Sequence, residues 1–363
     1  MQPMKLSRLF LFVILAGFAC AAAAQNNFSD VDRWLSAQTG NMGGRSLLVV
    51  YKDGKLIYTK AVNDMRAGQK LINRAIARRQ GKEANTEDYT PDTRQPIASC
   101  SKWLSAALVM TFIDEGKLSL SDTVGRFLPV LTQNGKGNIT ISQCLSHMTG
   151  IKAAELKDEL QDMRGMTSMD DAVRRIAMLP MEGTPGKVFH YSNTGLQLAG
   201  AVIEKISGKS FEQLFTERIA VPLGMTGTDF GKGPVALPAG GAISTPNDYI
   251  RFLEMILHKG MFRGKRILSE KAVADMQVNR ITGDVKVAYA PAEAGNFGYG
   301  FGEWVMDNIS PSNAVTSPGL FGSFPWIDNE RGYAGFLMTY YIKNDGRNQR
   351  YKQLKQLVDK AVK

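Results

Sequence analysis

The sequence predicts an α+β fold: an antiparallel β-sheet built from both chain ends, flanked by helices, with an inserted and mainly helical subdomain. Two observations lead to it. Strand patterns occur at about residues 45–62 and again at about 297–342, whereas helical patterns fill about 99–290 between them. A basic helical pattern then follows the last strand. Because strands at opposite ends of the chain share a core most economically in one sheet, we expect the helical region to be an insertion.

The first 24 residues form a separate segment in this prediction. Lys5 and Arg8 precede an uncharged apolar run at residues 9–18, and small residues follow up to Ala24. A basic start, a short apolar run and an A-x-A pattern are typical of a secretory signal peptide. The run is shorter than the roughly 20 residues that cross a bilayer. We therefore expect a periplasmic or extracellular protein, with residues 25–363 as its mature domain and no stable membrane insertion.

Two alternatives for this segment involve the membrane. The first is an anchor that is not cleaved, which the short apolar run disfavours. The second is a lipoprotein attached through Cys20. Gly17 and Phe18 precede that cysteine and make a poor lipidation context. Both alternatives are therefore less favoured than a cleaved signal peptide.

The composition is that of a globular protein with a basic surplus. Hydrophobic residues make up 44% of the chain and charged residues 21%, with a formal net charge of +10. The basic residues gather at about 70–82 and 343–363, without the interleaved aromatic residues or the modules of nucleic-acid-binding proteins. We therefore expect solvated basic faces and no nucleic-acid partner. Cys100 and Cys144 either form a disulfide or stay as buried free thiols.

The first elements after the signal segment are a helix and a hairpin. A short helix is expected at about residues 29–37, followed by strands at 46–51 and 56–61. Asp-Gly lies between the two strands, and this pair between apolar runs is a strong hairpin signal. Residues 62–95 are polar and basic, which indicates an irregular excursion from the hairpin.

The middle of the chain has helical patterns. From Ser99 to Glu115 the segment is apolar on most faces, as in a buried helix, and Gly116 follows as a common helix stop. Strand character then returns, and the apolar face of residues 351–361 predicts a packed final helix. The other helices are expected around 170–178, 194–206, 210–219, 248–258 and 269–276, and the strands at 299–306, 320–327 and 333–341.

Ser99 and Lys102 are the first pair of chemical interest. They open the buried helix three residues apart and therefore share one of its faces. The lysine nitrogen can meet the serine hydroxyl, and the positive end of the helix dipole favours a developing alkoxide. To act as a neutral base near pH 7, Lys102 needs a pKa well below that of a solvated lysine, which desolvation would supply. The alternative is a helix-capping serine, and the spacing alone favours it.

Tyr191 and Asn193 form a second candidate group. They lie on one loop, after a Gly-Thr-Pro-Gly turn and before a helical pattern that begins at Thr194. A tyrosine hydroxyl can transfer a proton, and an amide side chain can orient a substrate. The alternative is a structural loop in which Asn193 caps the following helix.

Four further segments stand in a fixed order along the chain. They are PIASCSK at 96–102 with EGKL at 115–118, LSHMTGI at 145–151, YSN at 191–193, and PAGG at 238–241 with ST at 244–245 and Asp248. In this order they resemble the class C β-lactamase and serine esterase superfamily of penicillin-recognising enzymes. The resemblance extends from about residue 46 to residue 341.

The resemblance implies an acyl-enzyme mechanism that needs no cofactor or metal. Ser99 would be acylated, and Lys102 and Tyr191 would move the protons. Asn193 would bind the acyl-side amide of the substrate, a small-molecule or peptide ester or amide. Among the residues themselves, no histidine, cysteine or carboxylate cluster has zinc spacing.

The third motif of this superfamily departs from its usual form. Where the family carries Lys-Thr-Gly, or His-x-Gly in many esterases, this chain has Ser317-Pro318-Gly319. Gly319 lets the backbone approach a substrate closely. By family geometry, the amide of Leu320 would join that of Ser99 as an oxyanion hole, with each donor worth about 3 kcal/mol.

Ser317 cannot supply the cation that pairs with a penicillin or peptide carboxylate. The sequence therefore favours an esterase or amidase, unless a nearby lysine or arginine substitutes. A β-lactamase or D-Ala-D-Ala-type peptidase is the alternative enzyme, and a non-catalytic penicillin-fold binding module is the alternative outside enzymes. No G-x-S-x-G elbow supports a Ser-His-Asp triad. We expect His147 to be structural, and His190 is a weaker candidate for tuning Tyr191.

Overall fold

The computed structural model describes residues 26–79, 81, 84–153, 165–307, 312–343 and 345–362. The predicted signal peptide, including Cys20, lies outside these residues, so export and cleavage stay predictions. Within the described ranges, no helix combines the length and the apolar character needed to cross a bilayer.

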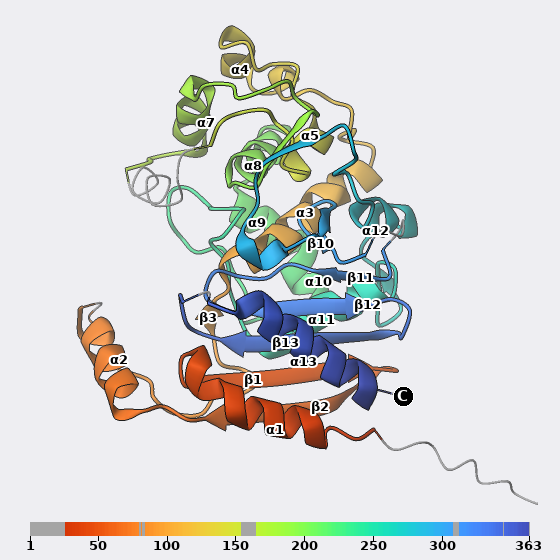
Figure 1. Ribbon diagram of the computed structural model, residues 1–363. Coiled ribbons are helices and arrows are strands. Elements are labelled where there is room, and N and C mark those ends of the chain that lie inside the picture. Colours follow the sequence, from red (N-terminus) through yellow and green to blue (C-terminus); the bar gives the residue numbers. More distant parts are fainter. Residues whose placement is uncertain are drawn as a thin grey trace, which may run out of the picture.

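A seven-stranded antiparallel sheet joins the two ends of the chain (Figure 1). Its central contact is between β1 and β13, where Ser46 lies opposite Thr339 and Lys52 opposite Tyr333. This pairing confirms the predicted fold class. In spatial order the strands are β2 (Lys55–Asn63), β1 (Arg45–Lys52), β13 (Tyr333–Thr339), β12 (Phe324–Asp328), β11 (Ala314–Thr316), β10 (Trp304–Val305) and β9 (Gly298–Tyr299).

The sheet separates two hydrophobic cores. Alternate residues of β1 point to opposite faces, so Leu47 enters the larger core beside the helical region and Leu48 enters the smaller one. The helices α1 (Ser29–Gln38) and α13 (Arg347–Ala361) cover the smaller core (Figure 1). A central strand covered on both faces is apolar throughout, as the run of hydrophobic residues in β1 indicates.

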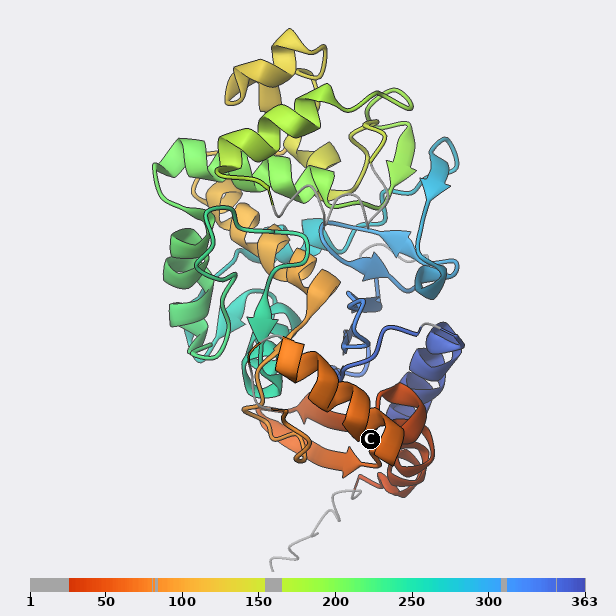
Figure 2. The same ribbon diagram turned by 90° about the vertical axis from the view of Figure 1, so that its left-hand side faces the viewer.

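The helix α3 (Ser101–Asp114) lies at the centre of the helical region (Figures 1 and 2). It is buried from Ser101 to Phe112, as the sequence predicts. Cys100 and Cys144 are buried free thiols, so the disulfide alternative is wrong. The remaining helices are α4 (Pro129–Gln133), α5 (Ile141–Leu145), α7 (Met169–Met178), α8 (Thr194–Ser207), α9 (Phe211–Phe215), α10 (Val221–Leu223), α11 (Pro246–Leu257) and α12 (Glu270–Met276), with a π-helical turn at Thr216–Ala220.

The region 62–95 is not irregular throughout, because it contains α2 (Ala67–Arg79). Ala77 faces the body of the protein and is 8% exposed, whereas Leu71 and Ile72 are 63% and 62% exposed. Large apolar side chains on the outer face reverse the usual amphipathic arrangement, so hydrophobic periodicity does not predict this helix. Figure 1 shows α2 standing out from one side of the molecule.

Strands near the C-terminal end of the chain are shorter than the sequence predicts. The expected strand at 299–306 is two strands, β9 and β10, because Gly302 has a φ of 76° and turns the chain between them. The expected strand at 320–327 begins only at Phe324. Residues 317–323 instead form the connection from β11 to β12, and β11 itself is not predicted.

The basic C-terminal region is not a uniformly solvated face. Lys355 is 9% exposed, and its Nζ atom lies 2.7 Å from Asp328 and 3.0 Å from Asp359. Arg347 is only 1% exposed. Buried cations persist where carboxylates and carbonyls pair with them, and such partners come from distant segments that the local pattern does not reveal.

Candidate active site

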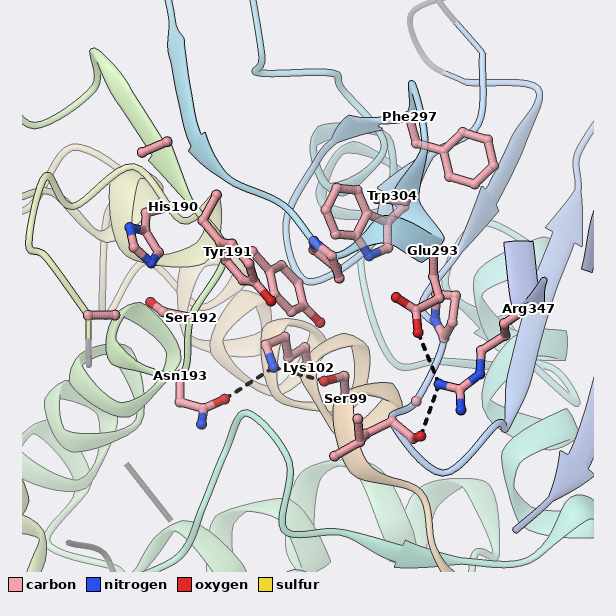
Figure 3. A pocket seen from close by; sticks show the side chains of 18 of the residues that line it. Ser99, Lys102, His190, Tyr191, Ser192, Asn193, Glu293, Phe297, Trp304 and Arg347 are labelled. Atoms are coloured by element: carbon pink, nitrogen blue, oxygen red, sulfur yellow. Dashed lines mark hydrogen bonds and ion pairs between the residues drawn. The ribbon is translucent and has the colours of Figure 1, made fainter. Parts of the chain in front are cut away.

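A cavity of about 700 Å³ lies where the start of α3 meets the loops that follow β4 (Val188–His190) and β11. Figure 3 shows the side chains that point into it. Of the seven site residues that the sequence predicts, Ser317 alone does not line the cavity. The six that line it are Ser99, Lys102, Tyr191, Asn193, Gly319 and Leu320.

Ser99 is positioned by a short strand pairing and a strained turn. The strands β3 (Gln95–Pro96) and β5 (Ile243–Ser244) pair just before it in the chain. Ala98 then has a φ of 47°, a left-handed conformation that costs a non-glycine residue roughly 1–3 kcal/mol. A 3-10 turn leads from Ala98 directly into α3. The strand pairing before Ser99 and the helix after it thus fix this nucleophile candidate at the helix start.

Lys102 lies beside Ser99, as the spacing predicts. Its Nζ atom is 3.2 Å from the Ser99 hydroxyl, 3.3 Å from Asn193 Oδ1 and 2.8 Å from the Ala239 carbonyl. The lysine is 1% exposed, so these contacts replace most of its hydration. The Ser99 hydroxyl therefore contacts a buried amine, which differs from a simple helix cap.

Tyr191 completes the group around Ser99 (Figure 3). The Lys102 amine lies 4.7 Å from the centre of the Tyr191 ring, and the Trp304 ring stacks on it with the two ring centres 5.2 Å apart. Burial raises the pKa of the phenol, and a hydrogen bond with Ser99 opposes that shift. The phenol is therefore protonated at neutral pH and can donate a proton.

The loop that carries Tyr191 rests on His147. The Nε2 atom of His147 lies 3.0 Å from the Tyr299 hydroxyl, and its Nδ1 accepts a hydrogen bond from the Ser192 amide at 3.4 Å. Burial holds the pKa of His147 well below the usual range, so the imidazole is neutral. This arrangement is the structural role that the sequence predicts for His147.

His190 pairs with a carboxylate. Among the described residues, no hydrogen bond joins His190 to the Tyr191 hydroxyl. Its Nδ1 atom lies 2.6 Å from Glu182 Oε1. The strand β4, which ends at His190, pairs in parallel with β8 (Lys286–Tyr289), and this pairing orients the loop that follows. Tuning of Tyr191 by His190 is therefore not supported by a direct contact.

The third motif contributes its glycine and leucine to the cavity. Ser317 is 2% exposed and donates to the carbonyls of Gly302 at 3.0 Å and Ser99 at 3.3 Å. A Cβ atom at Gly319 would lie 2.3 Å from the Ile97 carbonyl, so only glycine fits there. The motif thus lies against the start of α3, and its serine braces the backbone.

Two charged residues of the cavity come from segments that local motifs do not assign to the site. Arg347 enters from the start of α13, and Glu293 from the 3-10 turn before β9; their Nη1 and Oε1 atoms are 3.1 Å apart. Lys152 is an exposed cation in the lining. The apolar part of the lining includes Tyr289, Pro291, Phe297, Trp304 and Pro318.

Comparison with known families decides the classification. A family model described as Beta-lactamase matches residues 31–361. The chain belongs to the beta-lactamase family. The matched range includes both ends of the sheet and every cavity residue described above, so the fold and the whole candidate site lie within the family domain.

Two curated relatives share part of this beta-lactamase family domain. Protein Rv1367c of Mycobacterium tuberculosis is 27% identical over an alignment of 290 residues, with 65% of this chain and 72% of that protein covered. Protein flp of Staphylococcus aureus is 28% identical over 196 residues, which is 53% of this chain and 36% of that protein.

Solved structures are similar to this chain over nearly its whole length. A beta-lactamase-like protein from Bacteroides dorei has a TM-score of 0.77 and 29% identity, covering 93% of this chain and 99% of that chain. EstCE1, described as a hydrolase with promiscuous acyltransferase activity, has a TM-score of 0.70 and 20% identity, covering 91% and 100%. A family VIII carboxylesterase has a TM-score of 0.71 and 18% identity, covering 92% and 97%. At these two lower identities, the likeness shows the fold alone.

Proposed function

We propose that this beta-lactamase family member is an exported serine hydrolase that cleaves an ester or amide through an acyl intermediate on Ser99. One observation carries the proposal: the buried amine of Lys102 lies 3.2 Å from the Ser99 hydroxyl at the wall of a cavity. A nucleophile and a proton acceptor within hydrogen-bond reach are the minimum for acyl transfer to a side chain. Export rests on the signal-like first 24 residues.

In the proposed reaction, Ser99 Oγ bonds to the substrate carbonyl carbon as its proton passes to Lys102. The carbonyl oxygen becomes an oxyanion that the Ser99 and Leu320 amides stabilise. When the intermediate collapses, the carbonyl–heteroatom bond breaks, and the leaving oxygen or nitrogen takes a proton delivered through Tyr191. A water molecule then attacks the acyl carbon and releases the acid and free Ser99.

The lining of the cavity favours a largely apolar ester or amide. Ser317 faces away from the cavity and carries no charge, so the third motif offers no cation to a substrate carboxylate. Aromatic rings such as Phe297 and Trp304 instead supply apolar surface. The hydrolase and carboxylesterase descriptions of the two fold neighbours agree with this choice.

Two observations favour β-lactam or peptide substrates as the second candidate function. Lys152 is an exposed cation in the cavity lining, where it can meet an anionic group of a substrate. The description of the structural neighbour from Bacteroides dorei also names β-lactamase as its type of protein. A non-catalytic binding module receives less support, because the contact between Lys102 and Ser99 is intact.

One experiment separates these functions. Residues 25–363 are incubated with p-nitrophenyl butyrate, a chromogenic cephalosporin and a D-Ala-D-Ala peptide, and any adduct is mapped by mass spectrometry. We expect turnover of the ester and a transient acyl group on Ser99. Ser99→Ala should lower ester turnover by about 10³-fold or more, since the nucleophile itself is lost.

The matched control is Ser121→Ala, a substitution at an exposed loop serine. Its turnover should equal that of the parent protein. Faster turnover of the cephalosporin or peptide would select the second function, and a stable Ser99 adduct without turnover would select the binding module. Unchanged hydrolysis by Ser99→Ala would reject the proposed mechanism.

A further inference from the structure

Arg347 is a buried arginine that contacts the loop carrying Leu320 (Figure 3). Its Nη1 atom donates to the Leu320 carbonyl at 3.0 Å and to Glu293 Oε1 at 3.1 Å. Glu293 lines the cavity, and its side chain is 16% exposed. The arginine and the carboxylate therefore hold one another beside the backbone unit that the proposed oxyanion hole uses.

The second guanidinium nitrogen fixes Arg347 to the end of the sheet. Its Nη2 atom donates to the carbonyls of Tyr341 at 3.1 Å, Ile342 at 3.2 Å and Lys343 at 3.1 Å. The guanidinium carbon also lies 4.6 Å from the centre of the Tyr341 ring. Both Nη atoms thus have acceptors within the protein, which suits a brace better than a ligand for a substrate anion.

The opposite side of the same loop is held by the start of α3. The missing Cβ atom of Gly319 allows contact with the Ile97 carbonyl, and the Cys100 thiol donates to the Ser323 carbonyl at 3.7 Å. The Gly319 amide also donates to the Ser323 carbonyl at 2.8 Å and closes the loop. Among the hydrogen bonds of the described residues, only Arg347 donates to the Leu320 carbonyl.

We propose that Arg347 and Glu293 are positioning residues that fix the Leu320 backbone so that its amide points at the developing oxyanion. The inference rests on the proposed acyl-Ser99 function. The Leu320 amide lies between two held groups: the Gly319 amide, which donates to the Ser323 carbonyl, and the Leu320 carbonyl, which accepts from Arg347. With both ends of this short stretch held, the amide between them keeps its direction. Preorganised donors stabilise an oxyanion because they need no reorientation during the reaction.

The brace also gives the C-terminal helix a part in the chemistry. Arg347 is the first residue of α13, which otherwise packs over the far core of the sheet. The guanidinium links that helix to the cavity through Leu320, and the adjacent Asn348 side chain donates to the Glu293 carbonyl at 2.5 Å. The helix start and the turn at Glu293 therefore form one support for the oxyanion side of the cavity.

The test compares Arg347→Met, Arg347→Lys and Glu293→Gln in the full mature protein. We expect kcat/KM for p-nitrophenyl butyrate to fall about 10- to 100-fold in Arg347→Met, with KM nearly unchanged, because a small displacement of a donor is costly in the transition state. The inhibition constant of phenylboronic acid, which forms a tetrahedral adduct on Ser99, should rise by a similar factor. Arg347→Lys should restore part of both losses, and Glu293→Gln should give a smaller loss.

The matched control is Arg350→Met on the same helix. Arg350 donates to the Asp345 carbonyl and makes no contact with Leu320 in the described residues, so both readouts should stay within about 2-fold of the parent. Equal values for Arg347→Met and Arg350→Met would overturn the brace. So would a loss of folding stability in Arg347→Lys and Glu293→Gln without a change in boronate affinity. If Ser99→Ala retains turnover, the proposed function has failed instead.

Discussion

Glu303 is a fully buried carboxyl group close to the cavity. It lies in the turn between β9 and β10, is 0% exposed, and neither carboxylate oxygen has a hydrogen-bond partner. Burial raises the pKa of this carboxyl well above its ordinary value of 4.5, and Arg280 opposes the shift only in part. Glu303 also interacts electrostatically with Tyr249 and Tyr299. Both phenols are neutral, because burial raises their pKa values as well. The folded protein therefore binds the proton of Glu303 more tightly than the unfolded chain does.

The raised pKa of Glu303 predicts a pH-dependent stability. Above pH 4.5 the unfolded state releases the proton of Glu303 while the folded state keeps it, so stability is full below that pH and falls as the pH rises toward the folded-state pKa. Glu303→Gln should remove this decline, and its advantage over the parent in urea unfolding should grow from pH 5 to pH 8. Glu330→Gln, at an exposed carboxylate, should follow the parent curve. Parallel curves for the parent and Glu303→Gln would contradict the prediction.

The contact between Ser99 and Lys102 was predictable at the residue scale because the two residues are close in the sequence. Ser99 and Lys102 are separated by one helical turn, and helix geometry alone brings i and i+3 together. Arg347 was not predictable in the same way. Its acceptors include the Leu320 carbonyl and Glu293, which are 27 and 54 residues away in the chain. A buried arginine and a solvated one look alike in the sequence when their partners are so distant.

At the element scale, the connection between β11 and β12 is held by a glycine. Gly319→Ala would place a methyl group 2.3 Å from the Ile97 carbonyl and 3.1 Å from the Cys100 sulfur. The loop must move away from α3, and we expect a loss of ester turnover of about 10²-fold from displaced donors, measured as kcat/KM. Gly68→Ala is the control, because its Cβ atom would meet nothing within 4 Å. A parent-like rate in Gly319→Ala would show that the close packing has no role in turnover.

The elements themselves differ in how far the sequence determines them. β1 and β2 were predictable because their apolar runs flank an Asp-Gly turn, and α3 because it is apolar on most faces. α2 was not, since its exposed face carries Leu71 and Ile72. β11 has only three residues, too few for a period to be recognised. Short elements of this kind are fixed by their neighbours in the sheet.

At the scale of the whole molecule, the C-terminal helix closes the second core. Leu354 is fully buried there, between the sheet and α1. Leu354→Ala should lower the free energy of unfolding by about 2–5 kcal/mol, the usual cost of a core cavity, as measured by urea denaturation. Lys360→Ala, at an exposed position of the same helix, should stay within about 0.5 kcal/mol of the parent. A small change in the free energy of unfolding of Leu354→Ala would show that the packing of α13 contributes little to the stability of the fold.

The pairing of β1 with β13 also sets the timing of folding. Ser46 on β1 pairs with Thr339 on β13, so the central contact of the sheet does not exist until nearly all of the chain has left the ribosome. Contacts between residues so far apart in sequence form slowly, because a long loop must close before they stabilise anything. A nascent chain of this design cannot complete its sheet while the segment that becomes β13 is still being made.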